Sequence, residues 1–405
     1  MNQAVFQNLR ILDMGWVWAG GVFGHTFKDM GAHVVKVETR RRLDPARLGR
    51  PIIGDKLDPE QAPMYHNVNR GKQSVSIDMT TPQGRELILN LAKISDMVVE
   101  NMSPGAIARA GLAYTDFTKV NPQIIMVSYP FAGQTGPYTQ LRGYGNPGGA
   151  LVGLDSLGAD PDGDEFCGYN QVIGDPSGGQ YAVIAALAAL RHRNKTGEGQ
   201  YVDLSMIEAV GTMLGEATMD YVMNGRTAQS RGNQHPYLAP HGIYPCEGDE
   251  QWISIAIETN EEWVTLCTAM SREDLATAPN LKRYAGRAQS RKEIDNEISS
   301  WTRTKPKYQV MELLQAQGIA AMPCLNQEDR YFDPHSKERE IYIEVDHPVL
   351  GKDPVYGVPY KLSETPGMVR GPAPLLGQHN DYVMQDLLGI SPSEQARLVE
   401  ERVLY

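Results

Sequence analysis

The sequence lacks several features that would place it in a specialised class of protein. It contains no run of 18 or more apolar residues, so it predicts no membrane-spanning helix. Residues 1–12 do not show the basic-then-apolar order of a secretory signal. The 9 histidines form no H-x-x-x-H or H-E-x-x-H pattern, and no G-x-S-x-G is present. These absences disfavour a metal site and a serine hydrolase.

Cysteine and positive charge are also scarce. The 4 cysteines are far apart, without the spacing of a disulfide framework or a metal site, which favours a reducing, cytoplasmic setting. Cys167 has no cationic motif beside it and is expected to be inert. The chain carries 38 Lys+Arg against 49 Asp+Glu, a net charge of −11, which argues against nucleic acid or an anionic membrane as a partner.

What is present indicates an α/β protein. A chain of 405 residues with 41% hydrophobic residues can form two domains. Residues 9–13 and 33–38 read as strands, separated by a glycine turn at 19–24 and a short helix at 25–30. This βαβ pattern predicts a parallel sheet. Later segments continue the alternation, with expected strands at 96–100, 124–128 and 200–206 and expected helices at 82–94, 181–192 and 208–223.

Composition changes near residue 225 and suggests a domain boundary. We expect a large domain over 1–226 and a small one over 227–330, where 242–257 alternates like strands of a second sheet. A Pro-rich segment over 331–405 follows and ends in a predicted helix at 380–388.

Two glycine-containing segments could bind phosphates. Residues 20–24 read Gly-Gly-Val-Phe-Gly and, with Glu38, resemble half of a dinucleotide fingerprint, although the spacing is not G-x-G-x-x-G and a tight turn is the alternative. An NAD-dependent dehydrogenase therefore has only weak support. Residues 69–74 place Arg70 and Lys72 beside a glycine, where they could hold phosphates or simply lead into a hairpin.

A third segment, 100–105, follows an expected strand and opens a short helix that carries Arg109. Ser103 and Pro104 suit an N-cap and first helical position. Ligands of α/β sheets bind at such strand ends.

Asp175 stands at the start of the most apolar predicted helix. Asp175-Pro176 is an N-cap signature, but Gly178 and Gly179 follow, and each costs a helix about 1 kcal/mol. We expect that something approaches the backbone closely there. An exposed, ionised Asp175 could be a nucleophile, with the N–H groups of Gly178 and Gly179 stabilising an oxyanion.

Taken together, these segments resemble the class III coenzyme A transferases, the CaiB/BaiF family that includes formyl-CoA transferase. The resemblance covers nearly the whole chain and rests on the order and spacing of modest motifs. They are N-R-G-K-x-S at 69–74, V-E-N-x-x-P-G at 99–105, G-Q-T-G-P at 133–137, T-G-x-G-Q at 196–200, R-G-N at 231–233 and A-P-L-L-G at 373–377.

The resemblance implies a site and an architecture. It places the nucleophilic aspartate on Asp175. It implies a Rossmann-like large domain, a smaller α+β domain, two chains interlinked like rings, and a segment from about 340 to 405 that returns to the large domain. It places coenzyme A contacts on Lys72, Asn101, Met102 and Arg109, with Arg142 and Arg40 as further basic positions.

The chain also departs from the family pattern. Gly145 stands where many relatives have an acid, and Trp18 stands where formyl-CoA transferase has a glutamine. Formate and oxalate are therefore disfavoured as substrates. A larger acid is favoured, aromatic or dicarboxylic, such as benzylsuccinate, although aromatic residues can equally pack in a core. The aromatic residues concerned are Trp16, Trp18, Tyr144 and Tyr169.

The resemblance thus predicts transfer of CoA from an acyl-CoA, perhaps succinyl-CoA, to an organic acid through an aspartyl mixed anhydride and an aspartyl-CoA thioester. The CoA thioester is a substrate, and no tightly bound cofactor is expected. The partner is a second copy or a related subunit. An acyl-CoA racemase is one alternative, disfavoured because Tyr144 occupies the place of its histidine. A non-catalytic subunit of a heteromeric transferase is another.

Overall fold

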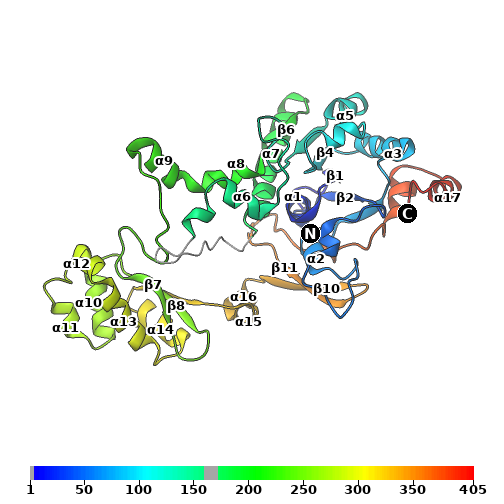
Figure 1. Ribbon diagram of the computed structural model, residues 1–405. Coiled ribbons are helices and arrows are strands. Elements are labelled where there is room, and N and C mark those ends of the chain that lie inside the picture. The colour runs from blue at the N-terminus through cyan, green and yellow to red at the C-terminus, as the bar shows by residue number, and fades with distance from the viewer. Residues whose placement is uncertain (1–3, 159–171) are drawn as a thin grey trace. The chain divides into compact units, whose positions relative to one another are not determined.

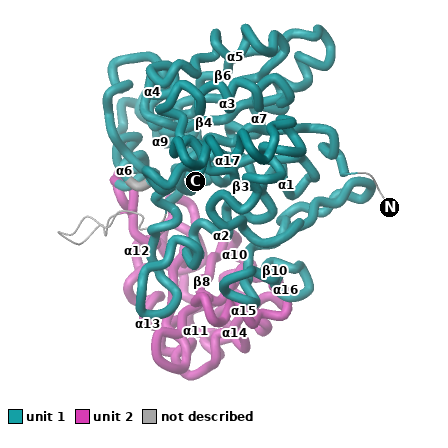
Figure 2. The backbone as a smooth tube through the Cα atoms, turned by 90° about the vertical axis from the view of Figure 1, so that its right-hand side faces the viewer, with its two compact units in different colours: residues 1–155, 168–227, 337–405 teal, residues 156–167, 228–336 magenta. Residues whose placement is uncertain are grey.

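A computed structural model describes residues 4–158 and 172–405. The chain forms two compact units, shown in different colours in Figure 2. Unit 1 comprises residues 1–155, 168–227 and 337–405, and unit 2 comprises residues 156–167 and 228–336.

Unit 1 is built on a parallel sheet of six strands in the order β3-β2-β1-β4-β5-β6 (Figure 1). The expected α/β class with a parallel sheet is confirmed, and this order is that of a Rossmann fold. The order reverses between β1 and β4, so the carboxyl ends of these two strands mark the switch point. The strands are β1 (Arg10–Asp13), β2 (His33–Glu38), β3 (Gln73–Ser76), β4 (Met97–Glu100), β5 (Ile125–Ser128) and β6 (Tyr201–Asp203).

Successive side chains of a strand point to opposite faces of the sheet, and here both sets are apolar, so helices cover both faces. On one face, Ile11 and Val99 pack with Phe23 of α1 (Val17–Asp29) and Ala186 of α7 (Gly174–Thr196). The opposite face packs against α3 (Pro82–Lys93), α5 (Tyr114–Val120) and the C-terminal segment. The shorter elements of this part are η1 (Pro45–Leu48), α2 (Pro63–Asn69), α4 (Ala106–Arg109), α6 (Gly145–Leu151), η2 (Asp155–Leu157), α8 (Met206–Gly211), η3 (Thr212–Leu214) and α9 (Gly215–Asn224).

The glycines at 20–24 lie inside helix α1 rather than in a turn, so that expectation was wrong. A Cβ added to Gly20 would lie 2.4 Å from the carbonyl carbon of Gly15, and one added to Gly21 would lie 2.3 Å from the Val68 side chain. These glycines let α1 approach its neighbours closely. The expected single helix at 208–223 is instead divided into α8, η3 and α9, with glycines at 211 and 215 beside the break.

The C-terminal segment adds a hairpin and two helices to unit 1. These are β10 (Tyr342–His347), β11 (Gly351–Tyr356), a π-helix at Tyr382–Leu387 and α17 (Pro392–Glu400). Leu404 forms an antiparallel bridge with Ile77, and the Asn380 side chain accepts a hydrogen bond of 2.9 Å from the Ser76 N–H. The end of the chain therefore lies beside β3.

Unit 2 contains a three-stranded antiparallel sheet with helices around a core that includes the buried Trp263. Its strands are β7 (His241–Pro245), β8 (Trp252–Ala256) and β9 (Ala320–Cys324). Its helices are α10 (Asn260–Ala269), α11 (Glu273–Thr277), α12 (Tyr284–Gln289), α13 (Arg291–Thr302), α14 (Lys307–Gln315) and α15 (Gln327–Phe332), and α16 (Pro334–Glu338) follows.

Candidate active site

The carboxyl ends of the parallel strands carry a row of polar residues. Asp13, Glu38, Glu100, Ser128 and Asp203 are the last residues of β1, β2, β4, β5 and β6, and all but Asp203 are buried. Because parallel strands end at one edge, these side chains hold the loops that leave that edge. Ligands of such sheets bind outside this edge, at the switch point.

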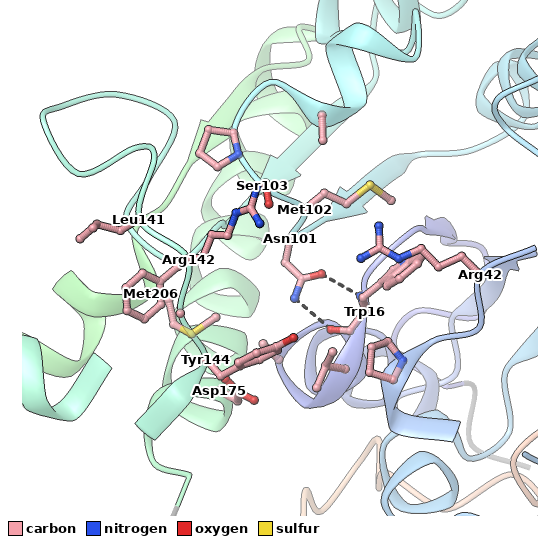
Figure 3. Close-up of a pocket in the computed structure, with 17 residues that line it drawn as sticks. Trp16, Arg42, Asn101, Met102, Ser103, Leu141, Arg142, Tyr144, Asp175 and Met206 are labelled. Atoms are coloured by element: carbon pink, nitrogen blue, oxygen red, sulfur yellow. Dashed lines mark hydrogen bonds between the residues drawn. The ribbon is translucent and has the colours of Figure 1, made fainter. Parts of the chain in front are cut away.

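A cavity of about 550 Å³ opens at this edge within unit 1. It brings together six of the site residues expected from the sequence, namely Trp16, Asn101, Met102, Arg142, Tyr144 and Asp175 (Figure 3). In Figure 3, Asp175 and Tyr144 lie next to each other. The other lining residues are Val17, Ala19, Arg42, Pro45, Ser103, Pro104, Ala106, Phe131, Leu141, Gly143 and Met206.

Asp175 lies in the first turn of α7 and is only 5% exposed. The expectation of an exposed carboxylate was therefore wrong. Burial raises the pKa of Asp175 from 3.8 to about 6, and a hydrogen bond from the Gly145 N–H opposes this rise. At neutral pH most of the carboxyl is still ionised. A partly desolvated carboxylate beside a cavity has the properties of a nucleophile.

Gly145, at the start of α6, has no room for a side chain. A Cβ there would lie 2.5 Å from Val172 Cγ1 and 2.9 Å from Asp175 Oδ1. Conversely, a Cβ on Gly174 would lie 2.8 Å from Gly145 Cα. Because neither glycine has a side chain, the backbones at the starts of α6 and α7 can lie in close contact. The group that lies beside the Asp175 carboxyl at position 145 is therefore a backbone N–H, which favours the ionised form of Asp175.

Gly178 and Gly179 allow close packing at this helix start. A Cβ on Gly178 would lie 2.8 Å from Met206 Cγ, and one on Gly179 would lie 2.8 Å from Val22 Cβ. They are the fifth and sixth residues of α7, past the four helical positions whose N–H groups have no intrahelical partner. Packing against Met206 and Val22 thus accounts for both glycines, and the oxyanion role expected for them does not fit this placement.

The wall opposite α6 is formed by the loop after β1. The Asn101 side chain bonds both backbone groups of Trp16, accepting from its N–H at 2.7 Å and donating to its carbonyl at 2.9 Å (Figure 3). Val17 has a positive φ of 57°, a strained conformation for a β-branched residue, and its N–H is held by Asp44 at 2.9 Å. The Arg42 guanidinium lies 4.9 Å from the centre of the Trp16 ring.

Lys72 does not reach this cavity. Its ammonium is buried and donates to Asp13 Oδ2 at 2.7 Å, Asn69 Oδ1 at 2.9 Å and the Gly21 carbonyl at 3.2 Å. All three of its donors are used, so the expected contact with coenzyme A does not fit this structure. Arg70 is likewise buried against Asp29. Through Arg70 and Lys72, the 69–74 segment thus forms ion pairs with the end of α1 and the end of β1.

Three further expected residues lie outside the lining of the cavity. Arg40 and Arg109 are exposed, and Trp18 is half-buried. Arg42, which was not predicted from the sequence, lines the cavity together with the expected Trp16. Residues 40–42 are three consecutive arginines, and nothing in their local pattern indicates which of them lies at the site. Cys167 and Tyr169 lie outside the described residues.

No group of three or more His, Cys, Asp or Glu in residues 4–158 and 172–405 is placed to hold a metal ion. Over the same part of the chain, no helix is both long enough and apolar enough to cross a bilayer.

Comparisons with known proteins agree with the geometry. The family model described as CoA-transferase family III matches residues 6–380. The chain is 32% identical over 398 residues to succinyl-CoA–D-citramalate CoA-transferase of Chloroflexus aurantiacus, covering 98% of this chain and 97% of that one. It is 29% identical over 385 residues to succinate–glutarate CoA-transferase of Agrobacterium fabrum, covering 94% of each.

A solved structure is similar over its whole length. The crystal structure of a CaiB/BaiF family protein from Brucella suis superimposes with a TM-score of 0.87 at 28% identity, covering 96% of this chain and all of that one. The family match extends over nearly all of the chain, and the curated relatives are covered almost end to end. The chain therefore belongs to CoA-transferase family III and is a CoA-transferase.

Proposed function

We propose that this transferase moves CoA from succinyl-CoA to a dicarboxylic acid by covalent catalysis on Asp175. The observation that carries the proposal is a buried carboxyl with a raised pKa beside a cavity that also contains two arginines. No other carboxylate lines that cavity among the described residues.

The reaction proceeds through acyl exchange in which the thioester energy is conserved. An Asp175 oxygen attacks the succinyl thioester carbonyl, and collapse of the tetrahedral intermediate expels CoA thiolate and leaves a mixed anhydride. The thiolate attacks the aspartyl carbonyl and releases succinate, which leaves an aspartyl-CoA thioester. The acceptor carboxylate then attacks the aspartyl thioester, which expels CoA thiolate and forms a second mixed anhydride. The thiolate attacks the acceptor carbonyl of this anhydride, which yields the acceptor's CoA thioester and releases the Asp175 carboxylate.

The residues around Asp175 favour this sequence. The Gly145 N–H already donates to the carboxylate, and the same donor can stabilise the charge that returns to an aspartyl oxygen when the anhydride breaks. Burial excludes water, which would otherwise hydrolyse the anhydride. The enzyme needs no ATP, because each step exchanges one activated acyl group for another.

Arg42 and Arg142 support a dicarboxylic acceptor. Both line the cavity, and in Figure 3 they lie on opposite sides of Asn101. Their positive charge, in a chain with a net charge of −11, can hold the phosphates of coenzyme A and the second carboxylate of the acid. The acids for which the two relatives are named, D-citramalate and glutarate, are dicarboxylic acids. An aromatic dicarboxylic acid such as benzylsuccinate fits the same reasoning, because Tyr144 is exposed to the cavity.

The direct experiment is to trap the acylated aspartate. The protein is incubated with succinyl-CoA, treated with hydroxylamine or borohydride, digested, and the mass of the peptide containing Asp175 is measured. A modified Asp175 supports the proposal, and Asp175→Ala must lose both the modification and CoA exchange. Exchange that continues in Asp175→Ala contradicts it. A panel of acids as acceptors then identifies the second substrate.

The proposal extends to a second chain. Two chains interlinked like rings, either identical or related, would cover apolar surface that unit 1 leaves open. Four residues of α9, Met219, Tyr221, Val222 and Met223, are each more than half exposed. Relatives from Chloroflexus aurantiacus are named as alpha and beta subunits of one transferase. Light scattering of the purified chain distinguishes a dimer from a monomer that awaits a related subunit.

A further inference from the structure

Glu100 is a buried carboxyl that the chemistry above does not use. It is the last residue of β4, and it is fully buried. The next residues, 101–104, all line the cavity. The hydrogen bonds of Glu100 therefore affect the position of the loop that forms this wall of the cavity.

Two loop N–H groups are fixed by side chains, one from the end of β4 and one from the loop after β5. The Met102 N–H donates to Glu100 Oε2 at 2.7 Å. The Gly105 N–H donates to Gln134 Oε1 at 3.1 Å. These two contacts hold the two ends of the 102–105 segment.

The two anchors are joined to each other. Gln134 Nε2 donates to Ser128 Oγ at 2.7 Å, and the Ser128 hydroxyl donates to Glu100 Oε1. Glu100 and Ser128 are paired in register at the ends of β4 and β5. The Gln134 backbone N–H is in turn held by Asp203, at the end of β6, at 2.9 Å. The loop thus rests on the aligned ends of three strands.

We propose that Glu100, Ser128 and Gln134 form a hydrogen-bonded clamp that positions the 101–105 wall for the pantetheine and phosphate parts of the CoA thioester. The clamp consists of positioning residues, because none of the three lines the cavity. This inference rests on the proposed function only in naming CoA as the molecule held against that wall.

Protonation of Glu100 does not release the clamp. Burial raises the pKa of Glu100 from 4.5 to about 7, so neutral and ionised forms coexist near neutral pH. A carboxyl oxygen accepts the Met102 N–H in either form. A glutamine, which resembles the neutral acid, is therefore expected to preserve the clamp, whereas an alanine removes it.

The test measures CoA binding by calorimetry in the full-length protein. Both N–H groups are partly buried, and removing the acceptor of such a group has a cost that corresponds to about tenfold in affinity. Glu100→Ala and Gln134→Ala are expected to weaken CoA binding about tenfold, and Glu100→Gln to stay within about threefold of the unsubstituted protein. Gln134 lies in a half-buried loop, so Gln134→Ala keeps the test informative if Glu100→Ala fails to fold.

Asp96 supplies a matched control. It precedes β4 at the opposite edge of the sheet, where its carboxylate accepts the Arg10 N–H at 2.7 Å. Asp96→Ala is expected to lower the melting temperature but leave CoA affinity unchanged. The inference is overturned if Gln134→Ala binds CoA normally, or if Asp96→Ala weakens binding as much as Glu100→Ala. Normal CoA binding with no acylation of Asp175 in the unsubstituted protein would instead refute the proposed function.

Discussion

Replacing Gly145 by alanine is expected to stop acylation of Asp175 while leaving the fold intact. The added Cβ would lie 2.5 Å from Val172 Cγ1, 2.9 Å from Asp175 Oδ1 and 3.0 Å from the Asp175 backbone nitrogen. Carbon atoms in contact normally stay about 3.5–4.0 Å apart, so Val172 must move by about 1 Å or more. The Asp175 carboxyl has to move as well, because it lies against the same Cβ.

The size of the effect follows from these distances. Overpacking of this kind costs about 1–3 kcal/mol of folding stability, which a domain with ordinary stability survives. Displacing a reacting atom by about 1 Å can cost about 100-fold in rate. We therefore expect Gly145→Ala to slow acylation of Asp175 by succinyl-CoA at least about 100-fold. Gly145→Glu, which adds a larger side chain at the same place, is expected to be inactive for the same steric reason.

The assay is the rate at which the Asp175 peptide gains its hydroxylamine-trapped modification. Gly148→Ala is the matched control in the same helix, because a Cβ there would meet Phe131 at 3.4 Å and Ile207 at 3.5 Å, which are ordinary contacts. Gly148→Ala should therefore keep its rate. A folded Gly145→Ala protein that is acylated as fast as Gly148→Ala would refute the steric reasoning and the assigned contact between Gly145 and Asp175.

Four further predictions follow from the same geometry. The rate of Asp175 acylation under limiting donor should rise about tenfold per pH unit below about pH 6 and level off above about pH 7, because the reactive form is the carboxylate; a rate independent of pH from 5 to 8 would contradict this. Asp175→Asn should stabilise the protein by as much as about 3 kcal/mol at pH 8. The cost of the buried charge is absent below the ordinary pKa of 3.8 and complete above about 6, so in denaturant titrations the gain should vanish near pH 3. Arg42→Ala and Arg142→Ala should each raise the KM for succinyl-CoA or the acceptor about tenfold with less effect on kcat, and an unchanged KM for both substrates would exclude the residue from binding. Lys72→Ala should lower the free energy of unfolding by about 3–5 kcal/mol, since it leaves Asp13 buried without its partner, and a stable variant that only binds CoA weakly would restore Lys72 as a ligand contact.

Much of the fold could be predicted because its signals are local. The strands at 33–38 and 97–100 and the helix at 82–93 follow from apolar periodicity and caps within a few residues. Helix α1 was misread for the opposite reason. Glycines at 20, 21 and 24 usually indicate a turn, and only the close approach of Gly15, Val68 and Lys72, some of them distant in the sequence, shows why a helix carries them.

The site was predictable in part. The sequence singled out Trp16, Asn101, Met102, Arg142, Tyr144 and Asp175, and the structure places them around one cavity. The clamp beneath the loop was missed. Gln134 belongs to the G-Q-T-G-P segment at 133–137, but nothing in that segment indicates a contact with Glu100, and Ser128 belongs to no motif. Their relation depends on the register between β4 and β5.

By itself, the sequence determined the parallel α/β class, the segments that build the sheet, and an aspartate at the start of an alanine-rich helix, because periodicity and capping act over a few neighbouring residues. The tertiary structure alone decided which charges serve the fold and which face the cavity. Lys72 forms its ion pair with Asp13, which is 59 positions away in the sequence, so its charge is neutralised inside the fold. Arg42 lines the cavity, whereas Arg40 does not. The burial that raises the pKa of Asp175, and the bare Gly145 backbone beside it, likewise arise only when distant segments pack together.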